Sequence, residues 1–156
     1  MVAFSDMGPH ADSTTGDVYT TATGGTVNAI QMDSGKKFVE IGLLKNTSGL
    51  NEALTKDSTK GISFFTQTFT LVLGDVTIEN KAFVESVMNQ PVAVIIKTRT
   101  GKYFAAGLNG LFELASAEGG TGVAETDLIG YTLTFSGLST GTMKLVDPSI
   151  VAGLIA

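Results

Sequence analysis

The side chains that enzymes use for catalysis are sparse in this sequence and poorly placed for it. His10 is the only histidine, and it lies in a small, polar segment without a candidate nucleophile beside it. A Ser–His–Asp triad needs its histidine within reach of a nucleophile and an orienting carboxylate. A metal site built on imidazole normally combines several ligands. We therefore interpret His10 as a solvated residue.

Two glycine motifs resemble phosphate-binding loops only superficially. The run Gly119–Gly122 does not lead into a helical pattern, and Gly101–Lys102 lacks the upstream glycine and the following Ser or Thr of a P-loop. Phosphate loops hold their ligand with backbone N–H groups that open a helix. We expect flexible loops or turns at both places and no nucleotide site.

Acidic residues gather around the second of these glycine stretches, at Glu118, Glu125 and Asp127. Carboxylates are ligands for Ca²⁺, but this spacing matches no EF-hand, so a solvated acidic loop is favoured. Paired carboxylates also serve glycoside hydrolysis, yet the sequence shows no aromatic-lined subsite and contains no Trp. The sequence therefore predicts a protein that is not an enzyme and that holds no cofactor and no metal.

Composition limits the remaining classes. A chain of 156 residues is typical of one domain, and with 43% hydrophobic and 16% charged residues it should bury a core. The absence of Cys excludes a disulfide scaffold and a thiolate zinc site. The first residues do not resemble a signal peptide, and no apolar run is long enough for a membrane span, so we expect no membrane anchor.

The charge balance argues against sequence-specific binding to nucleic acid. The net charge is −5, Arg99 is the only arginine, and the lysines are scattered along the chain. DNA readers need phosphate-neutralising Lys and Arg gathered on one face. A weakly acidic surface is ordinary for a dissolved protein, and it would also suit a conduit that lets DNA pass without binding it.

Alternation marks the elements that would position any functional surface. Residues 62–73 (ISFFTQTFTLVL) place Phe65, Phe69 and Leu71 on one side of a strand and threonines on the other. That polar side must face water or another protein. Further strands are expected at 27–32, 37–43, 91–98, 102–108, 111–116, 128–136 and 142–146. The sequence thus predicts a mainly β fold, a β-sandwich or barrel-like domain with one short flanking helix.

That helix is expected over about 77–89. Asp75 or Thr77 is placed to act as its N-cap, and Lys81 and Glu85 are spaced to pair on its exposed side. Pro91 follows and disfavours helix in the residue before it. Its apolar stripe would consist of Ile78, Ala82, Phe83 and Val87.

We expect three parts in the chain: an extended N-terminal arm over 1–26, a single β domain over 27–147, and an apolar tail over 148–156. Between two early strands, residues 44–60 read as a long polar connection, which is uncommon in a compact domain. It is either a projecting loop that orders on a neighbouring subunit or a short helix at 50–54. The apolar tail should dock on its own core or on a neighbour.

Several segments resemble the tail tube proteins of tailed bacteriophages, in particular those of phages and prophages of the Bacteroidetes group. The similar segments are FTQTFTLVL (65–73), NKAFVESVMNQPVAVIIKTRTGKYFAAG (80–107), GLFELAS (110–116) and GTGVAETDLIGYTLTFSG (120–137). The closing GTG…D..GYTLTF.G segment is the most specific of them. The order of elements is also similar to the tail tube fold, with one flanking helix and a long loop between early strands.

The resemblance implies a virion structural protein, made in the bacterial host cytoplasm, that assembles with itself and with other virion proteins. Its rings, usually hexameric, would stack into a tube through which DNA passes without specific recognition. Subunit contacts would come from the long loop and the tail, at Lys45, Asn46, Thr47, Ser48, Leu50, Leu54, Ile150, Val151 and Leu154. Thr66, Thr68, Thr70, Thr132 and Thr134 would line the lumen or face a neighbouring subunit.

Two other functions remain open at this stage. A capsid decoration protein or head–tail connector would share the composition and differ in symmetry. A carbohydrate-binding β-sandwich is the second alternative, although the absence of Trp makes it less favoured.

Overall fold

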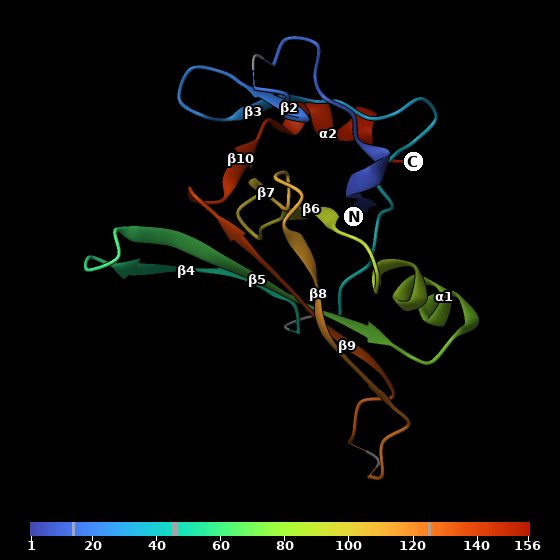
Figure 1. The fold of residues 1–156 in the computed structure, drawn as a ribbon. Helices are drawn as coiled ribbons and strands as arrows, with labels where there is room; N and C mark the ends of the chain where they lie inside the picture. Colours follow the sequence, from blue (N-terminus) through green and yellow to red (C-terminus); the bar gives the residue numbers. More distant parts are fainter. Residues whose placement is uncertain (14, 45–46, 125) are drawn as a thin grey trace.

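The computed structural model describes residues 1–13, 15–44, 47–124 and 126–156, and the fold is mainly β (Figure 1). Two sheets and two short helices make up the domain. The smaller sheet contains, in spatial order, β4 (Gly49–Asp57), β5 (Ile62–Gly74), β9 (Gly130–Ser139) and β8 (Phe112–Gly120). The larger sheet contains β1 (Val2–Ala3), β6 (Val92–Lys97), β7 (Tyr103–Ala106), β10 (Lys144–Val146), β3 (Val27–Ile30) and β2 (Tyr19–Thr21).

All neighbouring strands of the four-stranded sheet are antiparallel. In the six-stranded sheet, which forms a half-barrel, only β10 and β3 run parallel, and the other pairs are antiparallel. The strand β5 begins where the alternation predicts it, and its core side carries Phe69 and Leu71, both buried. The prediction of a mainly β fold with a sandwich or barrel-like arrangement is confirmed.

The hydrophobic core has two parts. One lies within the half-barrel, around Val27, Ala93 and Val146. The other lies between the four-stranded sheet and β6, where Phe135 stacks on Phe69 and Phe112 with ring centroids 6.1 and 6.2 Å apart. Because β6 contributes to both parts, the apolar run at 91–98 is central, as its composition predicts.

The flanking helix α1 (Ile78–Val87) confirms the predicted helix and its cap. The Thr77 side chain accepts a hydrogen bond from the N–H of Asn80, at 3.1 Å, and Lys81 lies 3.9 Å from Glu85. The predicted apolar stripe is partly wrong, because Ile78 is 85% exposed and Ala82 is also exposed. The other two predicted members, Phe83 and Val87, do pack on the core, together with Val84.

Three predicted features are wrong. Residues 37–43 do not form a strand; Phe38 makes one isolated bridge to Ile155, because its backbone bonds go to the C-terminal segment. Residues 49–57 are neither loop nor helix but the strand β4, paired along its whole length with β5. The strand β8 continues through Gly120, where a loop was expected.

The two ends of the chain belong to the domain. The segment expected as an extended arm contains β1, a 3₁₀ turn (Phe4–Asp6) and β2, and its residues Val2, Met7 and Val18 are buried. The apolar tail forms a second helix, α2 (Pro148–Leu154), whose N-cap is Asp147. Of the two expected docking places for the tail, its own core or a neighbour, the structure shows the first, because Val151 and Leu154 are buried there.

Candidate assembly surface

One face of the four-stranded sheet turns away from the core. Residues directly opposite one another in an antiparallel pair share a face. The register pairs Thr68 with Ser136 and Thr70 with Thr134, whereas the alternating residues of β5, such as Phe69, point to the core. The five threonines predicted to line a lumen or meet a neighbour therefore share this outward face, on the adjacent strands β5 and β9.

We call this surface the hydroxyl face. Its polar side chains are Asn51, Thr55, Asp57, Thr66, Thr68, Thr70, Glu113, Ser116, Glu118, Thr132, Thr134 and Ser136. Its apolar members are Ala53, Ile62, Phe64, Leu138 and Val72, of which Val72 is buried. The charged side chains that the four strands place on the hydroxyl face are all carboxylates. The lysine of these strands, Lys56, pairs with Ser63 and therefore lies on the opposite face. The hydroxyl face is thus uncharged or acidic throughout.

Both outer edges of this sheet are free in the described part of the chain. The edge strands β4 and β8 are each paired on one side only, with β5 and β9. Four antiparallel strands alternate in direction, so β4 and β8 run in opposite directions. When copies are related by rotation about one axis, β8 of one copy can therefore meet β4 of the next as an antiparallel pair. A free edge of this kind is a template for pairing with another chain.

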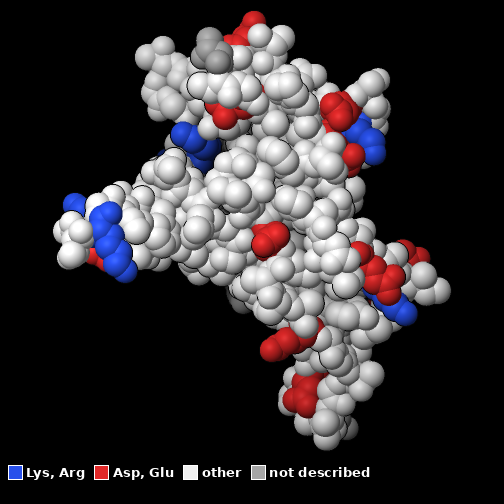
Figure 2. Space-filling view, viewed as in Figure 1, with Lys and Arg blue, Asp and Glu red and all other residues white. Residues whose placement is uncertain are grey.

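The two hairpins of the sheet project from opposite ends. β9 pairs with β5 only from Phe65 to Gly74, so the turn of the β4–β5 hairpin extends beyond β9 at one end. The turn of the β8–β9 hairpin, of which residues 121–124 and 126–129 are described, extends beyond Gly74 at the other end. Figure 2 shows basic side chains at the β4–β5 end and acidic ones along the β8–β9 hairpin. The basic residues are Lys56 and Lys60.

The tip of the β8–β9 hairpin is shaped by Asp127. Its carboxylate accepts hydrogen bonds from the N–H of Val123, at 2.8 Å, and of Ala124, at 2.9 Å. The bond from the Ala124 N–H, and after it the bond from the Val123 N–H, lower the pKa of Asp127 below its ordinary value. The carboxylate therefore stays charged near neutral pH. With the turn held in this way by the Asp127 carboxylate, the Val123 side chain is fully exposed. Glu125, the third acidic residue of the sequence pattern, lies outside the described residues.

The predicted contact residues of the loop fall in different places. Lys45 and Asn46 lie outside the described residues. The Thr47 hydroxyl donates to the Leu44 carbonyl at 2.9 Å, and the Ser48 hydroxyl accepts from the Val72 N–H at 3.4 Å. Leu50 and Leu54 belong to β4 and point to the core side of the sheet, where Leu50 is half-buried.

Leu54 lies opposite Phe65, at the level where the pairing of β5 with β9 ends. Its side chain is 57% exposed, which is high for a leucine. In the tail, Val151 and Leu154 are buried in the chain's own core, and Ile150 packs against it. Leu54 is thus the predicted apolar contact residue that the structure leaves accessible.

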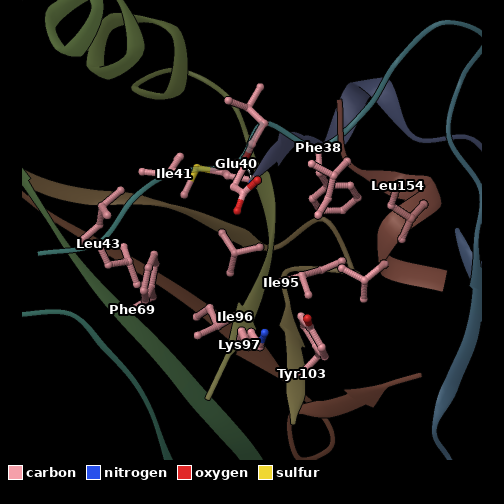
Figure 3. Close-up of a pocket in the computed structure, with 16 residues that line it drawn as sticks. Phe38, Glu40, Ile41, Leu43, Phe69, Ile95, Ile96, Lys97, Tyr103 and Leu154 are labelled. Carbon is pink, nitrogen blue, oxygen red and sulfur yellow. Dashed lines mark hydrogen bonds between the residues drawn. The ribbon is translucent and has the colours of Figure 1, made fainter. Parts of the chain in front are cut away.

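An apolar pocket of about 270 Å³ lies between the two parts of the core (Figure 3). Its walls come from β5, β6, α2 and an extended segment after Phe38, and include Phe69, Ile96 and Leu154. Lys97 and Glu40 also line it. The Lys97 ammonium lies 5.7 Å from the centroid of the Tyr103 ring. Several residues of the segment 37–43 line this pocket. Their alternation in the sequence predicted a paired β-strand, and it gave no indication of a cavity.

Within the described ranges, no group of three or more His, Asp or Glu residues is placed to hold a metal ion. None of the helices described is long and apolar enough to cross a membrane. The chain matches no protein-family model, no curated protein and no solved structure.

Proposed function

We propose that this protein is a structural subunit of a tailed-phage virion, and that its rings stack into a tail tube that conducts DNA. The observation that carries the proposal is the four-stranded sheet, which has two free edges of opposite direction and an outward face without cations. The resemblance of residues 65–73, 80–107 and 110–137 to tail tube proteins supports the same function.

Closure of the sheet into a barrel follows from its edges. Closing a barrel removes every free edge, which is the most complete way to satisfy edge N–H and C=O groups. Six copies, the usual number in the resembled family, would form a barrel of about 24 strands. Barrels of about 16–18 strands already enclose an aqueous channel, so this one would have a wide lumen.

The chemistry of the hydroxyl face suits the wall of such a channel. DNA carries one negative charge per roughly 1.7 Å of its axis, and Lys or Arg on the wall would bind its phosphates. The hydroxyl face offers threonine and serine hydroxyls with Asp57, Glu113 and Glu118. Such a wall repels phosphates weakly and stays hydrated, so DNA would slide along it without being held.

Negative-stain electron microscopy of the purified protein over a concentration series tests this function. Hollow rings or tubes are the expected result. Compact monomers at every concentration would overturn the proposal, and trimers without a lumen that bind empty capsids would favour a decoration protein.

An edge-blocked variant makes the test specific. Along the edge strand β4, successive N–H groups point alternately to β5 and to the free side. Proline has no N–H, so one of the two variants Ala53→Pro and Leu54→Pro loses a hydrogen bond to β5, and the other loses only a donor on the free side. That variant is identified by an unchanged urea unfolding midpoint of the monomer. It should form no rings; rings as abundant as those of the unaltered protein would show that β4 is not the joining edge.

A further inference from the structure

The apolar pocket is bordered by a segment that has the pattern of a strand but no strand partner. Residues 39–44, which we call the strap, continue from Phe38 along the pocket. Val39 exchanges backbone hydrogen bonds with Met1, at 2.8 and 2.9 Å, and Val39, Leu43 and Leu44 are exposed, Val39 at 55%. The strap therefore presents alternating apolar side chains to solvent beside an apolar cavity.

The strap lies beside the part of β5 that β4 leaves uncovered. β4 starts at Gly49, opposite Thr70, whereas β5 continues to Gly74. A methyl group built at Gly74 would lie 3.3 Å from Cδ1 of Leu44, which places the strap against that end of β5. The last residue of the strap thus lies at this end of β5, and the pocket lies on the core side of the same strand, at Phe69 and Leu71.

The charges around the pocket are mainly basic. Lys97 lines it, and the turn that follows β6 adds Arg99 and Lys102, all three exposed. In the part of the chain that the structure describes, none of these three forms an ion pair. Glu40 is the acidic residue of the pocket lining. An occupant with an apolar surface and carboxylates would satisfy both the cavity and this surplus of positive charge.

The geometry points to the β8–β9 tip of a second copy of this chain as that occupant. The tip exposes Val123, Leu128 and Ile129, and it carries Asp127. Its apolar side chains would fill the pocket and cover the strap, while the Asp127 carboxylate faces the basic side chains of Lys97, Arg99 and Lys102. This inference rests on the proposed edge-to-edge joining of copies, and it names the contact that completes each joint.

The direction of the strands brings the tip to the pocket. When β8 of one copy lies antiparallel along β4 of the next, its Phe112 end is near Asp57 and its Gly120 end is near Gly49. The chain beyond Gly120 is the tip, and the structure beyond Gly49 is the strap with its pocket. The same pairing that joins the edges therefore carries the tip onto the pocket.

Size and charge favour this hairpin over the other projecting one. An apolar cavity of roughly 150 Å³ accommodates a benzene molecule, so the pocket of about 270 Å³ has room for two or three aliphatic side chains. The β4–β5 turn also exposes apolar residues, Leu54 and Ile62, but it carries Lys56 and Lys60. Those cations would meet Lys97 and Arg99, and like charges brought together at an interface are costly.

Disulfide trapping tests the contact. Because the sequence contains no cysteine, the introduced thiols have no natural thiol to react with. Val123→Cys and Val39→Cys are made as separate variants, one with a tag that changes its size, then mixed and oxidised at low concentration. We expect a mixed disulfide at a yield about tenfold or more above that of Ile78→Cys with Val39→Cys, because docking raises the effective concentration of the two thiols. Ile78 is a matched control, being an exposed apolar residue on α1.

The possible results separate the explanations. A yield no higher than the control overturns the tip-to-pocket contact, and a higher yield from Leu54→Cys with Val39→Cys assigns the pocket to the other hairpin. If hollow rings form but the disulfide between positions 123 and 39 does not, the proposed tube is supported and the tip-to-pocket contact is refuted. The disulfide without hollow rings would support the contact in an open chain of copies and refute the tube.

Charge reversal at Lys97, whose side chain is exposed, provides a second readout. Lys97→Glu in the Val39→Cys chain should lower the yield of the mixed disulfide several-fold, because the new carboxylate would repel Asp127 of the tip. An unchanged yield would mean that Lys97 does not face the carboxylate of the tip.

Discussion

Gly107 shows how single residues fix the relation between the two sheets. It follows β7, its φ is +82°, and a Cβ there would lie 2.3 Å from the carbonyl oxygen of Val92 and 2.8 Å from Cβ of Phe112. Val92 belongs to the six-stranded sheet and Phe112 to the four-stranded one. Only a residue without a side chain lets these backbones approach so closely, so the join between the sheets depends on this glycine.

Gly107→Ala should therefore lower the free energy of unfolding by about 2–5 kcal/mol, from left-handed backbone strain and overpacking together. Gly101→Ala is the matched control, because Gly101 has the same φ of +82° but nothing within 4 Å of the added methyl. Gly101→Ala should lower the free energy of unfolding by only about 1–2 kcal/mol, the cost of left-handed backbone strain alone. Urea unfolding measures both; equal losses would show that the close contact relaxes at little cost.

At the scale of elements, α1 depends on its cap and on the core rather than on its own propensity. It spans Ile78–Val87, which is short for an isolated helix in water. Its first turn is secured by Thr77 and by Asn80, whose side-chain amide donates to the carbonyls of Gly74 and Asp75 at 3.0 and 2.9 Å. These bonds tie the helix start to the end of β5, so the cap also positions α1 on the sheet.

Thr77→Ala should cost about 0.5–2 kcal/mol of stability, since it leaves the N–H of Asn80 without its partner. Thr77→Ser keeps a hydroxyl at the same place and should cost much less. Thermal unfolding followed by circular dichroism compares the two. If the serine variant is as unstable as the alanine variant, the threonine contributes through its methyl group and not through capping.

The elements differ in how far the sequence predicts them. β5, β9 and α1 are set by local alternation and by cap residues, and they appear close to where those patterns place them. β4 has polar residues on both faces, and it becomes a strand because β5 supplies a partner along its whole length. Such pairing is tertiary information. Asp147-Pro148 was a usable sequence signal for the start of α2, an N-cap followed by proline.

The candidate surface was predictable to a similar degree. The period of two identifies the threonines of β5 and β9, but their common face depends on the register that pairs Thr70 with Thr134. The acidic members, such as Glu113 and Glu118, come from β8, which joins the face only through its pairing with β9. The pocket arises where two sheets, α2 and the strap meet, and no single segment encodes it.

At the scale of the whole molecule, the sheet is staggered as the wall of a closed barrel would be. Closure requires each strand to be offset from its neighbour, which tilts the strands relative to the barrel axis. Here β4 lies opposite Ile62–Thr70 of β5, while β8 reaches the level of Gly74 through β9. Each copy therefore brings an offset edge on both sides. Joining such copies head to tail is heterologous, and it closes into a ring when the rotation allows.

The proposed lumen makes a prediction about which face of the sheet points inward. Thr68→Cys would place a single thiol on the hydroxyl face, and Ile78→Cys would place one on α1, which packs on the opposite face. After labelling with a small gold cluster, tubes of the Thr68→Cys variant should show added density near the tube axis. Tubes of the Ile78→Cys variant should carry it away from the lumen, because a helix that covers the core side lies outside the barrel. Axial density from the α1 label instead would mean that the core side faces inward, and the hydroxyl face would then be the exterior of the tube.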